Sequence, residues 1–183
     1  MQFWKMNGAG NDFIILNNLE ERLPPSAFPL LARTLCTPHR SLGADGLMVV
    51  EQAQEGADFK MLFFNSDGSL GEMCGNGARC ICRYGYETGL SGPTQTVETT
   101  AGLVTGTRID RRQYRVQLNS PTVIRLHEAP VVEGRAWPCA YVELGSPGLP
   151  HAVVPYPGLA DADPQVLFQL AKALRSHPAL PKG

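Results

Sequence analysis

Cys74 is the residue whose surroundings most suggest chemistry, because it lies between a polar turn and the start of a helix-forming segment. A helix N-terminus offers unpaired backbone N–H groups and the positive end of the helix dipole, which lower a thiol pKa and bind anions. Gly75 and Gly77 have no side chains that would keep a ligand carboxylate from those groups. The pattern predicts a reactive thiol beside a carboxylate-binding loop. A buried, inert cysteine in a tight glycine turn is the alternative that the residues leave open.

The other cysteines show no catalytic or metal-binding pattern. We expect packing or structural roles for Cys80, Cys82 and Cys139. The spacing of Cys74, Cys80 and Cys82 matches no zinc knuckle or ribbon, and Cys36 with His39 is half of a zinc pattern without its partner half. No metal site is therefore expected. An odd number of cysteines and the lack of a signal-peptide core favour free thiols in a reducing cytoplasm.

Two further polar segments with glycines lie between apolar runs. The segment Asn7-Gly8-Ala9-Gly10-Asn11-Asp12 is typical of a hairpin loop between two strands. It is not a phosphate-binding loop, because no Lys-Ser or Lys-Thr follows it. Residues 39–46 likewise indicate a turn that leads into a strand, where Asp45 would fix the geometry of the turn.

The elements that must position these residues are readable from apolar periodicity. Strand-length apolar runs lie at residues 2–6, 13–17, 46–51 and 59–64. Residues 96–118 indicate successive antiparallel strands, with a turn at residues 110–112. Three helices are predicted: residues 26–36, residues 75 or 76 to about 87, and a segment after Asp163, which would be an N-cap before Pro164. In the last of these helices, one apolar face is formed by Leu167, Leu170, Ala171 and Leu174.

Length and composition restrict the class of protein. The 183 residues carry 16 basic and 17 acidic side chains, so the chain lacks the basic excess with which proteins bind nucleic acid. Its apolar runs are far shorter than the ~20 residues of a membrane helix, so no membrane partner is expected. Ten of the fifteen prolines follow Ser120, which marks a change of character. We therefore expect a first domain over residues 1–119 and the beginning of a second over residues 120–183.

Four segments together resemble the diaminopimelate epimerase family, cofactor-independent amino-acid racemases of lysine and peptidoglycan biosynthesis. They are KMNGAGNDFIIL near the start, GADGLMVVE in the forties, FFNSDGSLGEMCGNGARC, and the TTAG hairpin that follows. The stretch from Met61 to Arg79 is the most specific. Weaker agreement continues through residues 148–151 and the last helix, so the resemblance covers essentially the whole chain.

The resemblance implies an α+β fold in which antiparallel strands wrap around a central helix, in a pseudo-symmetric two-domain plan. It implies conversion of LL-diaminopimelate to meso-diaminopimelate by one cysteine thiolate and one cysteine thiol, without pyridoxal phosphate or another cofactor. Cys74 would be the first cysteine, and the backbone N–H groups of Gly75 and Asn76 would bind the substrate α-carboxylate. Asn11 and Asn65 would hold the distal amino-acid end. The expected partner is this small molecule, with a homodimer left open.

The chain also departs from the family pattern. Gly46 stands where many members have Gln, and Leu149 stands where many have Asn before Pro-His, and each change removes a polar substrate contact. The Cys-Gly-Thr-Gly motif that holds the family's second cysteine is absent. We therefore expect a truncated second domain and a chain that carries one of the two catalytic cysteines. The alternatives are a fragment or non-catalytic module that binds carboxylates, and a related racemase with another substrate.

Overall fold

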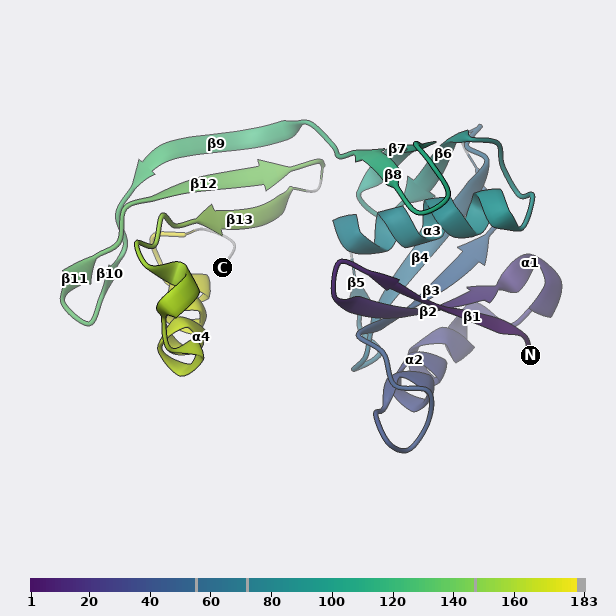
Figure 1. Cartoon of the computed structure of the whole chain (residues 1–183), viewed down its shortest axis with the longest axis horizontal. Coiled ribbons are helices and arrows are strands. Elements are labelled where there is room, and N and C mark those ends of the chain that lie inside the picture. The colour runs from purple at the N-terminus through teal and green to yellow at the C-terminus, as the bar shows by residue number, and fades with distance from the viewer. Residues whose placement is uncertain (55, 72, 147, 181–183) are drawn as a thin grey trace. The chain divides into compact units, whose positions relative to one another are not determined.

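The apolar runs of the first 119 residues pair into one curled sheet in the computed structural model of the chain, which describes residues 1–54, 56–71, 73–146 and 148–180 (Figure 1). The strands are β1 (Phe3–Gly8), β2 (Asn11–Asn17), β3 (Gly46–Glu51), β4 (Phe59–Asn65), β5 (Leu70–Gly71), β6 (Thr94–Thr99), β7 (Gly102–Arg108) and β8 (Tyr114–Gln117). Their order is β1-β2-β3-β4-β6-β7-β8, and β5 pairs with β4. The pairs β2–β3 and β4–β6 are parallel, whereas the other pairs are antiparallel.

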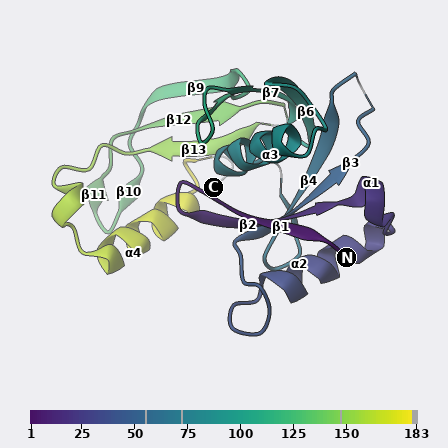
Figure 2. The same cartoon turned by 45° about the vertical axis from the view of Figure 1, so that its right-hand side comes forward.

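The helices of this part lie on both faces of the sheet. They are α1 (Asn18–Glu21), a short 3₁₀ turn (Pro25–Ala27), α2 (Phe28–Cys36) and α3 (Gly75–Glu87). Because side chains alternate along a strand, Ile14 and Leu16 of β2 pack with α2, whereas Phe13 and Ile15 pack on the face with α3. Figure 2 shows α3 between the β6–β8 strands and the β1–β2 hairpin, with α2 beyond the hairpin.

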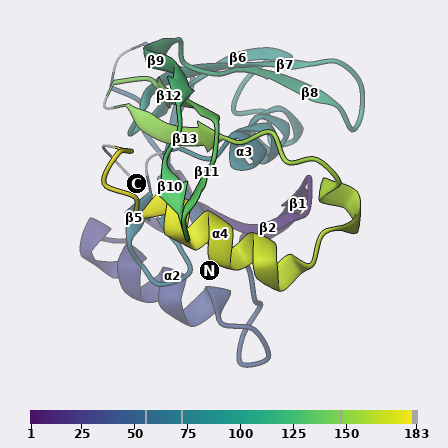
Figure 3. The same ribbon diagram turned by 90° about the vertical axis from the view of Figure 1, so that its left-hand side faces the viewer.

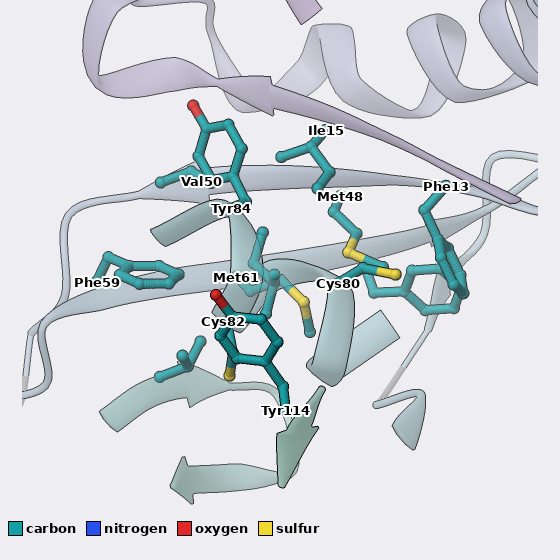
Figure 4. Packing of buried hydrophobic residues seen from close by; sticks show 13 residues of the cluster. Phe13, Ile15, Met48, Val50, Phe59, Met61, Cys80, Cys82, Tyr84 and Tyr114 are labelled. Carbon is teal, nitrogen blue, oxygen red and sulfur yellow. The ribbon is translucent and has the colours of Figure 1, made fainter. Parts of the chain in front are cut away.

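The core around α3 includes the stripe expected from the sequence and extends beyond it to the buried Gly77, Cys80 and Tyr84. Ala78, Ile81 and Cys82 are each at most 1% exposed, as their spacing of three and four residues predicts. The sheet curls, so the helix contacts strands from both of its ends, β1 and β2 as well as β7 and β8. Figure 4 shows the resulting cluster, in which Cys82 and Tyr84 of the helix lie among side chains of the sheet.

Residues Ser120–Gly183 form a second compact unit, distinct from Met1–Asn119. Its elements are β9 (Pro121–Glu128), β10 (Val131–Val132), β11 (Arg135–Ala136), β12 (Cys139–Leu144), β13 (Leu149–Val153), a 3₁₀ turn (Leu159–Asp161) and α4 (Pro164–Arg175). The antiparallel sheet has the order β13-β12-β9, and β10 pairs with β11. Helix α4 contacts β10, as Figure 3 shows. The core is small and centres on Cys139, Tyr141 and Leu180.

Most predicted elements are confirmed, with shifts of one to three residues at their ends. Helix α3 begins at Gly75, and Asp163 is the N-cap of α4, where its Oδ1 accepts a hydrogen bond of 2.8 Å from the backbone N–H of Gln165. The apolar face predicted for α4 is only partly buried: Leu174 is buried, whereas Ala171 is exposed. No helix in the described segments combines the length and hydropathy needed to cross a membrane.

Gly106 of β7 is a point of close approach between the sheet and α3. A Cβ atom at this position would contact Sγ of Cys82 and would lie 3.0 Å from its Cβ. Gly106→Ala should therefore lower the free energy of unfolding by about 1–3 kcal/mol, because the core would be overpacked. Urea unfolding measures this change, and the added variant Cys82→Ala should recover part of it by removing the sulfur.

Gly92→Ala is the matched control, because the nearest atom to a Cβ there is the Thr94 carbonyl oxygen at 3.9 Å. A Gly106→Ala protein as stable as Gly92→Ala would contradict the close packing of β7 on α3.

Candidate active site

Cys74 is the N-cap residue of α3 and has an extended backbone conformation. Its carbonyl accepts a hydrogen bond of 2.7 Å from the N–H of Ala78, and its side chain makes no capping bond. The thiol is only partly buried. The N–H groups of Gly75, Asn76 and Gly77 belong to the first helical turn and find no acceptor among the described residues. The structure thus places a thiol directly before free N–H donors.

The β1–β2 hairpin packs on this helix start. Its two-residue turn, Ala9 and Gly10, has φ values of 52° and 98°, the positive values that a tight hairpin turn of type I′ requires. A Cβ atom at Gly8 would lie 2.7 Å from the Asn76 carbonyl oxygen, so backbone meets backbone here. The hairpin thereby brings Asn11, the first residue of β2, beside the first turn of α3.

Two of the predicted substrate-binding residues are hydrogen-bonded to each other. The Asn76 amide donates from Nδ2 to Oδ1 of Asn11 at 2.9 Å. Asn11 in turn donates from Nδ2 to Oδ2 of Asp45 at 3.2 Å, and Arg79 donates to Oδ1 of Asn76. We call these four residues, Asp45, Asn11, Asn76 and Arg79, the amide relay. It ties the start of β2 to the first turn of α3.

Asn65, the last residue of β4, lies at the same end of the sheet but outside this relay. Across the strands, Phe13 of β2 pairs with Gly46 of β3, and Gly46 pairs with Asn65. The Asn65 amide donates to Oγ of Ser69 at 2.9 Å within its own turn. Among the described residues it forms no bond with Asn11 or with the α3 N-terminus, so its role in substrate binding stays a prediction.

Gly46, where the resemblance leads one to expect Gln, has a packing reason to be glycine. A Cβ atom there would contact Cε2 of Phe63 and would lie 2.7 Å from the Phe64 carbonyl oxygen. A Cβ at Gly71 of β5 would also meet the Phe63 ring. The ring therefore fills the space over both glycines, and it packs edge-on against Phe13 at a centroid distance of 6.1 Å.

The remaining thiols are buried, whereas Cys74 is only partly buried. Burial raises the pKa of Cys36 and Cys80 to about 11 and the pKa of Cys82 to about 12. Cys139 is also buried, which raises its pKa. These four thiols are packed in protein cores and are poor nucleophiles. In the described segments no three His, Cys, Asp or Glu side chains are grouped as a metal site would need.

Two residues of the relay, Asp45 and Arg79, are not indicated by the sequence pattern. The pattern predicts only a turn-fixing role for Asp45 and no role for Arg79. Arg79 lies three residues after Asn76, and this spacing places two side chains on one face of a helix. Leu149, the other departure from the family pattern, lies in β13 of the second unit, where it pairs with Leu144.

Comparison with known proteins agrees with this architecture. The family model described as diaminopimelate epimerase matches residues 3–124. The diaminopimelate epimerase of Aquifex aeolicus is 35% identical over 192 residues, which are 100% of this chain and 66% of that protein. That of Moorella thermoacetica is also 35% identical, over 201 residues, 100% of this chain and 68% of the relative. The chain thus spans about two thirds of the length of these relatives.

Solved structures share the fold. A probable proline racemase from Agrobacterium radiobacter, solved with bound carbonate, superposes with a TM-score of 0.64 at 19% identity, covering 97% of this chain and 63% of the other. A putative phenazine biosynthesis PhzC/PhzF protein from Clostridium difficile gives 0.54 at 13% identity, with coverages of 92% and 64%. The predicted α+β fold, with strands wrapped around a central helix, is confirmed by the neighbours and by the sheet around α3. The family model and the sequence relatives show that the chain belongs to the diaminopimelate epimerase family.

Proposed function

We propose that the protein takes part in the epimerisation of diaminopimelate between its LL and meso forms, with Cys74 as one acid/base residue. One observation carries the proposal: the partly exposed Cys74 thiol precedes three N–H groups that have no acceptor in the described structure. A thiol and an oxyanion-binding group at adjacent positions are what proton transfer at a carbon next to a carboxylate requires.

The chemistry follows from the order of these groups. The Cys74 thiolate would take the α-proton, and the electron pair of the broken C–H bond would spread into the carboxylate. The N–H groups of Gly75 and Asn76, with the positive end of the α3 dipole, would stabilise the negative charge that develops there. A second acid on the opposite face would then return a proton to the carbon and leave the inverted centre. No cofactor enters these steps.

The second acid is the part for which this chain offers no exposed thiol in its described segments. Cys36, Cys80, Cys82 and Cys139 are all buried. We therefore infer that the partner thiol comes from polypeptide outside these 183 residues. The second unit supports this view, because a small core is accompanied by exposed apolar side chains that further polypeptide could cover. They include Ile124, Leu126, Val131, Val153, Val166 and Phe168.

The distal end of the substrate would be held by amides. Asn11 has one N–H and one oxygen lone pair left after its two bonds in the relay. These suit the carboxylate and the ammonium group of the distal amino-acid end. Five free cysteines suit the reducing cytoplasm, where we place this step of lysine and peptidoglycan synthesis.

A second candidate is a racemase of this family that acts on a different amino acid. The observation that favours it is Gly46, which pairs with Asn65 across the strands and stands where many family members have Gln. The buried Phe63 ring fills the space in which a side chain at this position would begin. A panel of diamino diacids and simple amino acids, tested side by side for α-proton exchange, separates the two candidates.

Proton exchange in deuterated water tests the role of Cys74. We expect the chain alone to give little or no inversion of LL- or meso-diaminopimelate, with at most slow one-sided exchange of the α-proton. Cys74→Ala should abolish any exchange, because the base is lost, while Cys139→Ala serves as a control thiol outside the site. Mass spectrometry of the substrate measures incorporation. Robust inversion by the chain alone would contradict the proposal that it carries only one of the two catalytic cysteines. Unchanged proton exchange in the Cys74→Ala variant would contradict the role of Cys74 as the base.

Thiol labelling tests whether Cys74 is the accessible thiol. At pH 9, a group with a pKa of about 11, such as Cys80, is only about 1% ionised. Because Cys74 is partly exposed and the other three thiols are buried, brief iodoacetamide treatment of the folded protein should modify Cys74 and leave Cys36, Cys80 and Cys82 unmodified, as peptide mass spectrometry can show. Labelling in urea gives the control in which all five react. Native labelling of Cys80 or Cys82 at the rate of Cys74 would contradict the burial of these thiols.

A further inference from the structure

Two aspartates occupy equivalent places in the sheet. Asp45 directly precedes β3, donates from its backbone N–H to the Asp12 carbonyl at 2.9 Å, and accepts from the Asp12 N–H at Oδ2 at 2.8 Å. Asp58 directly precedes β4 and does the same with Thr96, at 2.9 and 2.7 Å. Each aspartate therefore joins the starts of two parallel strands. This shared arrangement accounts for both carboxylates as structural groups.

Asp45 differs from Asp58 in one bond. Its Oδ2 also accepts a hydrogen bond from the Asn11 side chain, which a purely structural strand link does not need. Asn11 and Asn76 are the two residues of the relay that the resemblance assigns to the substrate, and the relay ends in a carboxylate on one side and a guanidinium on the other.

The two charged ends determine how both amides are oriented. A guanidinium can only donate, so Asn76 must turn its oxygen to Arg79 and its Nδ2 to Asn11. Asn11 must then turn its oxygen to Asn76 and its Nδ2 to Asp45, which as a carboxylate can only accept. Reversing either amide would place donor against donor or acceptor against acceptor. The orientation of both amides is thus set by the charged groups of Asp45 and Arg79.

We propose that Asp45 and Arg79 are positioning residues that fix the amide orientations of Asn11 and Asn76, and thereby the selectivity of the site for the configuration at the distal end of the substrate. The proposal rests on the proposed function for its substrate. With its orientation fixed, the Asn11 amide places its free N–H on one side and its free oxygen lone pair on the other, and these two sides cannot exchange. A substrate carboxylate and ammonium match that order in one configuration of the distal carbon and mismatch it in the other.

The test compares Asp45→Ala with Asp58→Ala as its matched control. Both variants lose a strand-linking acceptor, so we expect similar losses in thermal stability. Only Asp45→Ala should shift the Nδ2 signals of Asn11 in ¹⁵N–¹H NMR spectra of the ligand-free protein and speed their exchange with water. Asp45→Asn should keep the wild-type pattern, because its side-chain oxygen can still accept both bonds.

Binding of meso- and DD-diaminopimelate by calorimetry gives the second readout. With its D centre at Cys74, the meso isomer presents an L distal carbon, whereas the DD isomer presents a D distal carbon. The ratio of the weaker isomer's dissociation constant to the tighter isomer's should fall about three- to tenfold in Asp45→Ala, because about one oriented hydrogen bond is lost. The same ratio should not change in Asp58→Ala. A general loosening of the fold would weaken the binding of both isomers equally and leave the ratio of dissociation constants unchanged.

The outcomes separate the two proposals. Unchanged Asn11 signals in Asp45→Ala, or an equal fall of the ratio in both alanine variants, would overturn the positioning role. If the wild-type protein binds neither isomer while the amide signals respond as expected, the substrate assignment fails and the control of amide orientation stands. Should Asp45→Ala not fold, Arg79→Met tests the opposite end of the relay and should shift the Nδ2 signals of Asn76.

Discussion

The enclosure of α3 by the curled sheet is the constraint on which the rest of the structure depends. Seven of the thirteen residues of the helix are buried, and the helix contacts strands from both ends of the sheet, so its axis and its rotation are fixed by packing. Its first residue follows from the same packing, since the hairpin backbone at Gly8 meets the Asn76 carbonyl. The position of Cys74 is thereby set by the packing of the helix and not by a bond of its side chain.

A polar network would be a weak way to hold such a site alone, because each neutral hydrogen bond contributes only about 1 kcal/mol net. In this protein, packing and the hydrogen-bond network have separate roles. Apolar burial places β2 and α3 side by side, and the amide relay selects orientations within a geometry that already exists. The core supplies most of the stability, while the Cys74 side chain makes no capping bond and the first N–H groups of α3 find no acceptor in the described structure.

Local signals in the sequence were enough for the elements, and less so for the site. The bounds of β3 and α3 follow from apolar periods and from glycines, both of which act over a few residues. The sequence does not predict the short α1 and β5, because segments of four and two residues are too short to show an apolar period. The bond between Asn11 and Asp45 joins residues 34 positions apart in the sequence, and no local pattern encodes it. From the sequence, Gly46 is interpreted as the loss of a polar substrate contact. The position of the Phe63 ring, which fills the space over Gly46, gives a packing reason for the glycine.

The mixed strand directions have a consequence for where the thiol lies. Crossover connections between parallel strands are right-handed in about 98% of cases. The chain makes two of them, from β2 to β3 through α2 and from β4 to β6 through α3, and both advance the same way across the sheet. Because β4 runs opposite to β3, the same handedness places the two helices on opposite faces. The antiparallel β3–β4 pair thus decides that Cys74 lies on the face turned away from α2: chirality of the backbone selects the side of the sheet on which chemistry can occur.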